Sequence, residues 1–130
     1  MNIQVIIKML IDAGIEENEA KAEVKILLEH FCKYTEKDKI LGRTLSDSEL
    51  DLIKEKVEHR IKERIPVQYI TGEGYFMGEF FKVSPDVLIP RDETEILVRK
   101  AIELIQDNDF KKVLDIGTGS GCIACTIAKN

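Results

Sequence analysis

The residues best suited to chemistry lie near the end of the chain, in the stretch Val113-Leu114-Asp115-Ile116-Gly117-Thr118-Gly119-Ser120-Gly121. An apolar run, an acidic residue and a glycine-rich segment predict a buried strand, a carboxylate at its carboxyl edge, and a turn that opens a helix. Open α/β sheets hold adenosine-containing cofactors in this way. We therefore predict a cofactor site at residues 113–121, where glycines let the backbone approach the ligand closely.

The spacing of the glycines decides among three cofactor classes. A P-loop that cradles phosphates needs a lysine and a hydroxyl residue directly after its last glycine. Here Cys122 and Ile123 follow Gly121, which excludes it. The dinucleotide fingerprint needs glycine or alanine at the sixth position counted from Gly117, where the chain has Cys122. The pattern that is left, acid-x-Gly-x-Gly-x-Gly, resembles the first motif of S-adenosylmethionine-dependent methyltransferases.

The acidic residue of this pattern favours a cationic cofactor. A dinucleotide brings a doubly negative pyrophosphate, which Asp115 would repel, whereas S-adenosylmethionine brings an ammonium and a sulfonium, which it would attract. The alternative is a tight strand-to-helix turn that Asp115 caps and that binds no ligand. Three alternating glycines exceed what such a turn needs.

Further motifs narrow the family. Residues 66–72 read Pro-Val-Gln-Tyr-Ile-Thr-Gly, residues 76–78 read Phe-Met-Gly, and residues 87–95 read Val-Leu-Ile-Pro-Arg-Asp-Glu-Thr-Glu. With the glycine turn, these motifs closely resemble the HemK/PrmC family, the glutamine-N5 methyltransferases that act on peptide-chain release factors. The resemblance covers the whole chain, although the family usually has proline where this chain has Asp92.

The resemblance implies an enzyme that passes the methyl group of S-adenosyl-L-methionine to the glutamine amide in the Gly-Gly-Gln loop of class-1 peptide-chain release factors. The cofactor residues that it implies are Asp115, Gly117, Thr118, Gly119, Ser120 and Gly121. It further implies that Arg91, Glu93 and Thr94 pack over the cofactor pocket. Arg91 and Glu93 could equally cap the helix that Pro90 introduces.

Two expected parts of such a site do not occur in the 130 residues. These are the family's Asn-Pro-Pro-Tyr motif, which orients the amide, and the acidic residue that binds the ribose about 20 residues past the glycines. We expect both to lie beyond Asn130, so that the chain is truncated, has no catalytic residues and is inactive alone. A lone central strand at 113–116 would expose unpaired edges, and we expect it to be disordered or paired with a second copy.

The elements that must position these residues fall into three predicted parts. Residues 1–66 are expected to form an all-α helical bundle for substrate recognition. Residues 67–90 are expected to form a β-hairpin linker. Residues 91–130 are expected to begin an α/β class I methyltransferase domain, which is Rossmann-like and here incomplete. The boundaries follow the change of apolar spacing after Pro66.

Within the bundle, apolar stripes at helical spacing predict three long helices and one short turn before Gly42. The first helix ends at Gly14, and the third begins with a capping box from Ser46 to Glu49. The residues expected on the stripes are Ile3, Ile6, Met9, Leu10, Ala20, Val24, Leu27, Leu28, Phe31, Leu50, Ile53, Val57 and Ile61.

Beyond the bundle, the aromatic-rich segment 75–83 predicts a hairpin that bends at Gly78-Glu79. A further helix is expected at residues 92–106. The residues expected on its inner face are Ile96 or Leu97, Ala101, Leu104 and Ile105.

Composition excludes several classes of protein. The net charge is −5, and neither half of the chain is basic, so we expect no direct nucleic-acid binding. No apolar run is long enough to span a membrane. Three cysteines are an odd number, which favours a reduced, cytoplasmic setting. Cys122 and Cys125 lack further ligands nearby, so we expect small packing positions and no metal site.

Two other functions stay open. The chain could be a non-catalytic module whose helical bundle docks a protein, or a relative of nucleic-acid adenine methyltransferases, which share the Asn-Pro-Pro-Tyr chemistry. The cluster of Arg60, Lys62 and Arg64 either contacts an acidic partner or ribosomal RNA, or is a solvated helix face. His30 and His59 are expected to be solvated.

Overall fold

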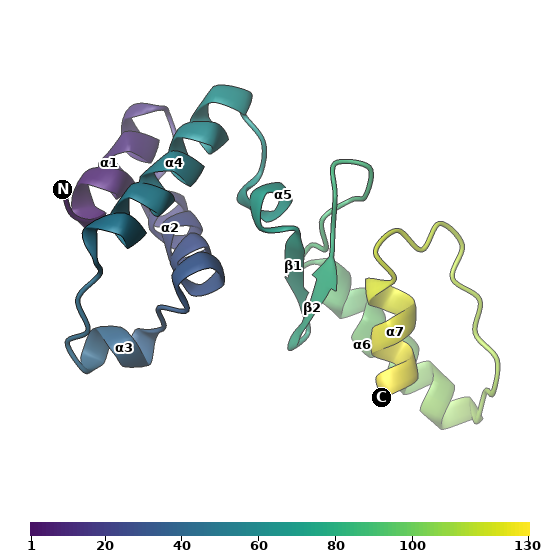
Figure 1. The fold of residues 1–130 in the computed structure, drawn as a ribbon. Helices are drawn as coiled ribbons and strands as arrows, with labels where there is room; N and C mark the ends of the chain where they lie inside the picture. The colour runs from purple at the N-terminus through teal and green to yellow at the C-terminus, as the bar shows by residue number, and fades with distance from the viewer. The chain divides into compact units, whose positions relative to one another are not determined.

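The chain forms two compact units. The computed structural model describes all residues from Met1 to Asn130. Residues 1–71 make up the first unit and residues 72–130 the second. Figure 1 shows helices α1 to α5 in the first unit, and a hairpin followed by helices α6 and α7 in the second. None of these helices combines the length and the apolar character needed to cross a membrane.

The first two helices follow the predicted apolar stripes. Helix α1 spans Ile3–Asp12, and the side chain of Asn2 accepts a hydrogen bond from the Val5 N–H at 3.0 Å. Gly14 follows this helix with a φ of +99°, the left-handed conformation predicted for its end. Helix α2 spans Glu17–Cys32.

The next two helices both begin with capping boxes. Helix α3 spans Glu36–Ile40 and is capped by Thr35, and helix α4 spans Asp47–Glu63. The Ser46 hydroxyl accepts from the Glu49 N–H at 3.2 Å, and the Glu49 carboxylate accepts from the Ser46 N–H at 2.9 Å. The capping box predicted for α4 is therefore confirmed, and such a cap contributes about 1 kcal/mol.

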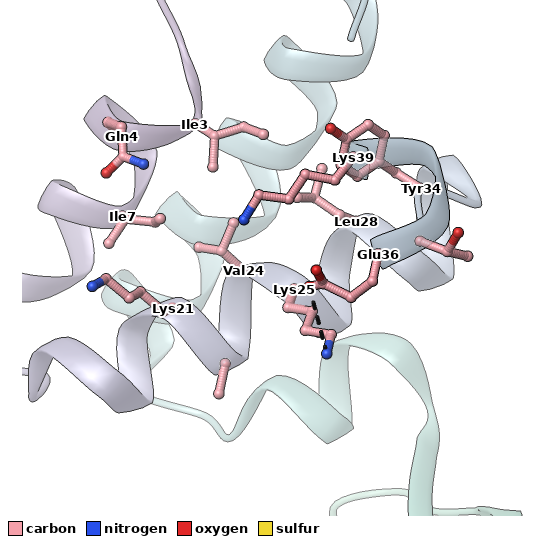
Figure 2. Close-up of a pocket in the computed structure, with 12 residues that line it drawn as sticks. Ile3, Gln4, Ile7, Lys21, Val24, Lys25, Leu28, Tyr34, Glu36 and Lys39 are labelled. Atoms are coloured by element: carbon pink, nitrogen blue, oxygen red, sulfur yellow. Dashed lines mark ion pairs between the residues drawn. The ribbon is translucent and has the colours of Figure 1, made fainter. Parts of the chain in front are cut away.

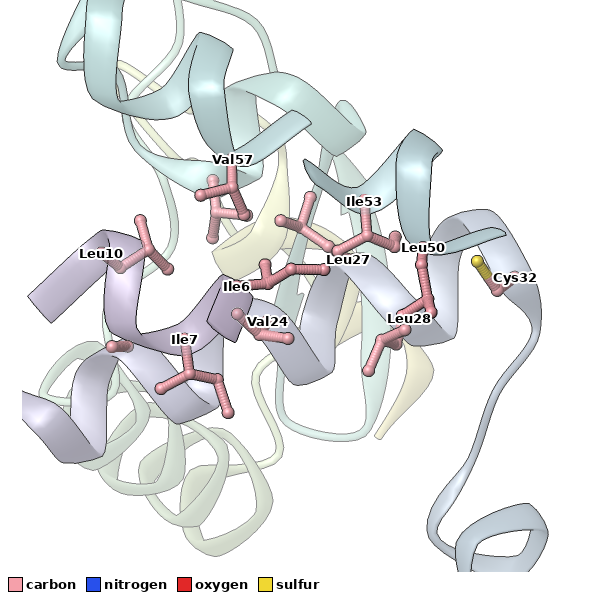
Figure 3. Close-up of a cluster of buried hydrophobic side chains, with 12 residues drawn as sticks. Ile6, Ile7, Leu10, Val24, Leu27, Leu28, Cys32, Leu50, Ile53 and Val57 are labelled. Atoms are coloured by element: carbon pink, nitrogen blue, oxygen red, sulfur yellow. The ribbon is translucent and has the colours of Figure 1, made fainter. Parts of the chain in front are cut away.

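One apolar core holds the first unit together, and Figure 3 shows part of it. Its buried members are Ile6, Ile7, Leu10, Ala20, Val24, Leu27, Leu28, Cys32, Leu50, Ile53, Val57 and Val67. Phe31 and Ile61, expected on the same stripes, are partly buried against it. Val67 belongs to α5, Val67–Thr71, a short helix that the sequence did not predict and that packs on α2 and α4. The helical N-terminal domain is confirmed.

The second unit begins with the predicted hairpin. Strand β1, Glu73–Phe76, pairs antiparallel with β2, Glu79–Lys82. The turn residues are Met77 and Gly78, with φ of +45° and +88°, which is the pattern of a type I′ turn. The predicted bend at Gly78-Glu79 was therefore one residue too late, because Glu79 already pairs within β2.

Helix α6 spans Thr94–Asn108, and its predicted inner face was only partly right, since Ala101 and Ile105 are half-buried. Val98 is fully buried and Ile102 packs beside it, together with Phe76 of the hairpin and Cys122 of α7. The expected inner residues Ile96, Leu97 and Leu104 are all exposed. The hairpin and α7 pack against Val98 and Ile102, whereas Ile96, Leu97 and Leu104 face solvent.

Residues 109–121 form an irregular segment that leads into α7, Cys122–Lys129. The predicted strand at 113–116 is not formed, and Leu114 and Ile116 are 83% and 87% exposed. A strand needs a neighbour for its backbone hydrogen bonds, and β1 and β2 pair only with each other. The Rossmann-like start expected for residues 91–130 is thus not confirmed. Pairing with a second copy stays a prediction.

Candidate functional site

The glycine turn uses each of its glycines for a conformation that other residues avoid. Gly117, Gly119 and Gly121 have φ of +69°, +58° and +84°. Each lies in the left-handed region, where a side chain brings strain. A Cβ on Gly121 would also lie 3.4 Å from the Cys125 sulfur. The alternation of glycines in the sequence therefore corresponds to three left-handed backbone positions at alternate residues.

Asp115 is tied to the glycine turn by a side-chain hydrogen bond. The Thr118 hydroxyl donates to Oδ2 of Asp115 at 2.9 Å, and the Gly121 N–H donates to the Thr118 carbonyl at 2.9 Å. Asp115 is half-buried. Its carboxylate is therefore held beside the turn and can attract a cationic group that approaches the glycines.

A second polar group of the turn has no partner. The Ser120 hydroxyl oxygen is buried and makes no hydrogen bond within the chain. A buried hydroxyl without a partner is costly, so such groups often belong to sites that bind something polar. The donor and acceptor capacity of Ser120 thus fits a ligand at this turn.

The surroundings of the turn are mainly apolar. Asp115 borders a hollow of about 350 Å³, in which Lys111 is the one cation. The apolar residues that line it are Ile105, Phe110, Val113, Ala124, Ile127 and Ala128. On another side, a methyl of Val87 lies 4.0 Å from where a Cβ on Gly119 would stand. Val87 therefore lies close to the turn, a proximity that the sequence did not predict.

The remaining predicted cofactor residues, Arg91, Glu93 and Thr94, lie where α6 begins. The Thr94 N–H donates to the Arg91 carbonyl at 3.1 Å, which makes a turn at the helix start. Glu93 occupies the capping position, yet its side chain makes no capping hydrogen bond. Their predicted role over the cofactor stays a prediction.

The cysteines differ in their environments. Cys122 is buried, as expected for a packing position. Cys32 is buried as well, and burial raises the pKa of its thiol. Cys125 is exposed, so its predicted packing role was wrong: it lies one helical turn after Gly121, on the open side of α7. The structure contains no cluster of three or more acidic, histidine or cysteine side chains suited to a metal ion.

The helical unit holds a buried ion pair that the sequence analysis missed. Nε of Arg60 on α4 donates to Oε1 of Glu23 on α2 at 2.6 Å. Glu23 is 6% exposed, and its other carboxylate oxygen is buried without a partner. Arg60 is thus not part of a solvated cluster. The signal was present, because Glu23 falls on the α2 stripe between Ala20 and Leu27.

The same unit also holds a pocket of about 450 Å³ between α1, α2 and the segment with α3. Figure 2 shows its lining, in which apolar side chains of α1 and α2 meet charged ones of α2 and α3. Lysines border it from two sides, at Lys21, Lys25 and Lys39. This pocket could not be predicted from the sequence, since it forms between three segments whose apolar residues have the pattern of core positions.

Comparisons with known proteins agree with the family resemblance of the sequence motifs. The family model described as the PrmC N-terminal domain matches residues 3–72. A release factor glutamine methyltransferase of Flavobacterium psychrophilum is 43% identical over 88% of this chain and 42% of its own length. The protein of that name from Bacillus subtilis is 40% identical over 92% of the chain and 42% of its own length. The one from Borreliella burgdorferi is 35% identical over 98% of the chain and 44% of its own length.

The chain thus spans less than half the length of these relatives. Within that span the family model covers the helical unit, and the matches to the Bacillus and Borreliella proteins extend over more than nine tenths of the chain. The chain therefore belongs to the HemK/PrmC family of release factor glutamine methyltransferases.

Proposed function

We propose that the chain provides two parts of a protein-(glutamine-N5) methyltransferase: a helical unit that docks a class-1 release factor, and a turn that holds S-adenosyl-L-methionine. The substrate group is the side-chain amide of the glutamine in the release factor's Gly-Gly-Gln loop. In this proposal residues 1–66 recognise the substrate, residues 67–90 link, and residues 91–130 begin the cofactor domain.

The observation that carries the proposal is the geometry of residues 115–121. Three left-handed glycines leave the backbone open to a close ligand, and Asp115 is fixed next to them by Thr118. When bound, S-adenosyl-L-methionine would supply an electrophilic methyl group on a positively charged sulfur. The Asp115 carboxylate would favour that cation and disfavour a phosphorylated cofactor. Ser120, with its unpartnered hydroxyl, would complete the polar contacts of the turn.

The segment that opens α6 is proposed to cover the bound cofactor. Arg91 and Glu93 are exposed, and Thr94 is half-buried, so their side chains are accessible to a ligand. Glu93 is not engaged in capping its helix, which leaves its carboxylate available. The proximity of Val87, shortly before these residues, to the glycine turn supports this role.

The 130 residues alone are proposed to be inactive. An amide nitrogen is a weak nucleophile, so catalysis must hold it about 3 Å from the methyl group and accept hydrogen bonds from its N–H groups. The Asn-Pro-Pro-Tyr motif that does this in the family does not occur in the sequence. Methyl transfer to a release factor by the purified 130-residue chain would contradict this part of the proposal.

A chimera tests the function directly. Residues 1–130 are fused to the part of the Bacillus subtilis relative that follows its matched region, and transfer of labelled methyl groups to a class-1 release factor is measured. We expect methylation of the Gly-Gly-Gln glutamine. Asp115→Asn should raise the KM for S-adenosyl-L-methionine and leave the KM for the release factor unchanged. Asp109→Asn, an exposed aspartate before the turn, is the matched control.

Two results would count against the proposal. A folded chimera that binds S-adenosyl-L-methionine but methylates no release factor would exclude the substrate. Equal cofactor KM values for the Asp115→Asn and Asp109→Asn chimeras would exclude the role of the carboxylate. Release-factor binding without methylation would favour the alternative of a non-catalytic docking module.

A further inference from the structure

The pocket of the helical unit has an apolar floor that solvent can reach. Ile7, Val24 and Leu28 belong to the core of this unit and also line the pocket, and Ile3 packs beside them. Its volume of about 450 Å³ is within the range of pockets that hold a ligand, or one or two large side chains of a partner. We call this site the α1–α3 pocket.

Positively charged side chains line the rim of the α1–α3 pocket, although the chain as a whole is acidic. Its lining includes three lysines and one carboxylate, Glu36, whereas the chain has a net charge of −5. Lys25 lies 3.6 Å from Glu36, and both side chains are more than half exposed. Figure 2 shows the long side chain of Lys39 extending from the α3 side of the pocket toward the α1 side. The rim is therefore a local cationic surface above apolar contacts.

The lysines of this rim are available to a partner. An exposed pair such as that of Lys25 with Glu36, or of Lys21 with Glu17 at 3.1 Å, is worth little and is weakened by salt. A partner carboxylate can replace such an internal contact at small cost. Lys39, in the last turn of α3, has an exposed side chain at the rim.

We propose that the α1–α3 pocket binds an acidic segment of the protein substrate, which places an apolar side chain on the floor and carboxylates beside Lys39 and Lys25. This inference rests on the proposed function, since the substrate is the release factor, and it adds the docking site and the chemistry of the segment bound there. Charge complementarity selects an acidic partner, and the apolar floor selects one with a hydrophobic anchor.

Charge reversals on one short helix test the inference. Binding of a class-1 release factor to the 130-residue chain is measured by fluorescence anisotropy. Lys39→Glu, at the rim, should weaken binding about tenfold at low salt. Lys37→Glu, an exposed residue of the same helix outside the pocket lining, should change it less than about twofold. Added salt should reduce the difference in affinity between the Lys39→Glu and Lys37→Glu variants.

A third variant separates docking from folding. Gln4 lines the pocket in the first turn of α1, where a carboxylate favours the helix. Gln4→Glu should therefore weaken binding while the melting temperature stays equal or rises. Hydrogen exchange of the complex should show protection in residues 3–7, 21–28 and 34–39.

Several outcomes would overturn the inference: no binding of the release factor to the chain, equal effects of Lys39→Glu and Lys37→Glu, or protection confined to other residues. A concentration-dependent dimer that Lys39→Glu disrupts would assign the pocket to a second copy instead. In the chimera, Lys39→Glu should raise the KM for the release factor and leave kcat unchanged. If the chimera methylates and this KM does not move, the pocket inference fails and the proposed function stands. If the chimera does not methylate release factors, the function itself fails.

Discussion

Ile53 and Ile96 are the same side chain in opposite environments: Ile53, in the helical unit, is fully buried, whereas Ile96, in the second unit, is 72% exposed. The contrast extends to the two units as wholes. The helical unit buries twelve residues in one core, while the core of the second unit has three buried members, Phe76, Val98 and Cys122. The helical unit is thus a complete packing arrangement, and the apolar residues of the second unit are largely without partners in the chain.

The same difference in packing separates the two candidate sites, the pocket of the helical unit and the glycine turn of the second unit. In the helical unit, a finished core supports a pocket with defined walls. In the second unit, the glycine turn has its local geometry but follows an exposed irregular segment, residues 109–116. The proposed docking can therefore depend on the helical unit alone, whereas the proposed cofactor binding needs further walls around the turn.

The largest expected difference between the two units is in the stability lost when an isoleucine of each is truncated to alanine. Ile53→Ala should lower the free energy of unfolding of the helical unit by about 2–5 kcal/mol, because it leaves a cavity in the core. Ile96→Ala should change the stability of the second unit by about 0.5 kcal/mol or less. Urea denaturation followed by circular dichroism measures the first, and amide exchange in α6 the second. Similar costs for the two variants would break the comparison.

Variants of the buried ion pair between α2 and α4 test how much this pair contributes to the stability of the helical unit. Arg60→Met should destabilise the helical unit by about 1–3 kcal/mol, because it leaves Glu23 buried and unpaired. The double variant Glu23→Leu with Arg60→Met should recover most of this loss, since an apolar pair of similar size can replace a buried ion pair. A double variant less stable than Arg60→Met would show that the pair itself stabilises the fold.

Helix caps sharpen the comparison at a smaller scale. Ser46→Ala removes both the cap of α4 and its reciprocal contact with Glu49, and should cost about 1 kcal/mol. Glu93 occupies the equivalent position of α6, where its side chain makes no capping hydrogen bond. Glu93→Ala should therefore cost much less stability. Thermal melts of the two variants measure the difference. Equal losses would mean that Glu93 stabilises its helix by another route.

The smallest expected effect is a loss of helical-unit stability in acid. Backbone hydrogen bonds within the capping boxes lower the pKa of Asp38 and of Glu49 from their ordinary values of 3.8 and 4.5. Because the folded pKa values are lowered, this stabilisation is present above pH 4.5 and is lost as the pH falls through and below the two ordinary values. Glu49→Gln should flatten the decline of melting temperature below pH 4.5, and Asp51→Asn, an exposed control on α4, should not.

The sequence predicted the helical unit well because the apolar stripes of its helices pack against one another within that unit. The stripe of α4 and the Ser46 capping box follow from local spacing, and both are confirmed. The position of Glu23 on the α2 stripe was a signal of burial, but its partner Arg60 could not be identified from local spacing, because the two residues lie on different helices. Helix α5 was missed because five residues after Pro66 are too few for a periodic pattern.

In the second unit, the same reasoning predicted environments that the chain does not provide. The apolar residues of 113–116 have the pattern of a central strand, but no neighbouring strand pairs with them. Ile96 and Leu97 have the pattern of a core face, yet the hairpin and α7 cover Val98 instead. The glycine turn was predictable because positive φ at Gly117, Gly119 and Gly121 is a local property that glycine encodes directly.

The most direct measurement is a pair of calorimetric titrations of the 130-residue chain, one with a class-1 release factor and one with S-adenosyl-L-methionine. We expect saturable binding of the release factor, carried by the helical unit, and no saturable binding of the cofactor, whose turn lacks surrounding walls. Tight binding of S-adenosyl-L-methionine without any binding of the release factor would contradict this expectation, because the second unit alone would then be the functional one.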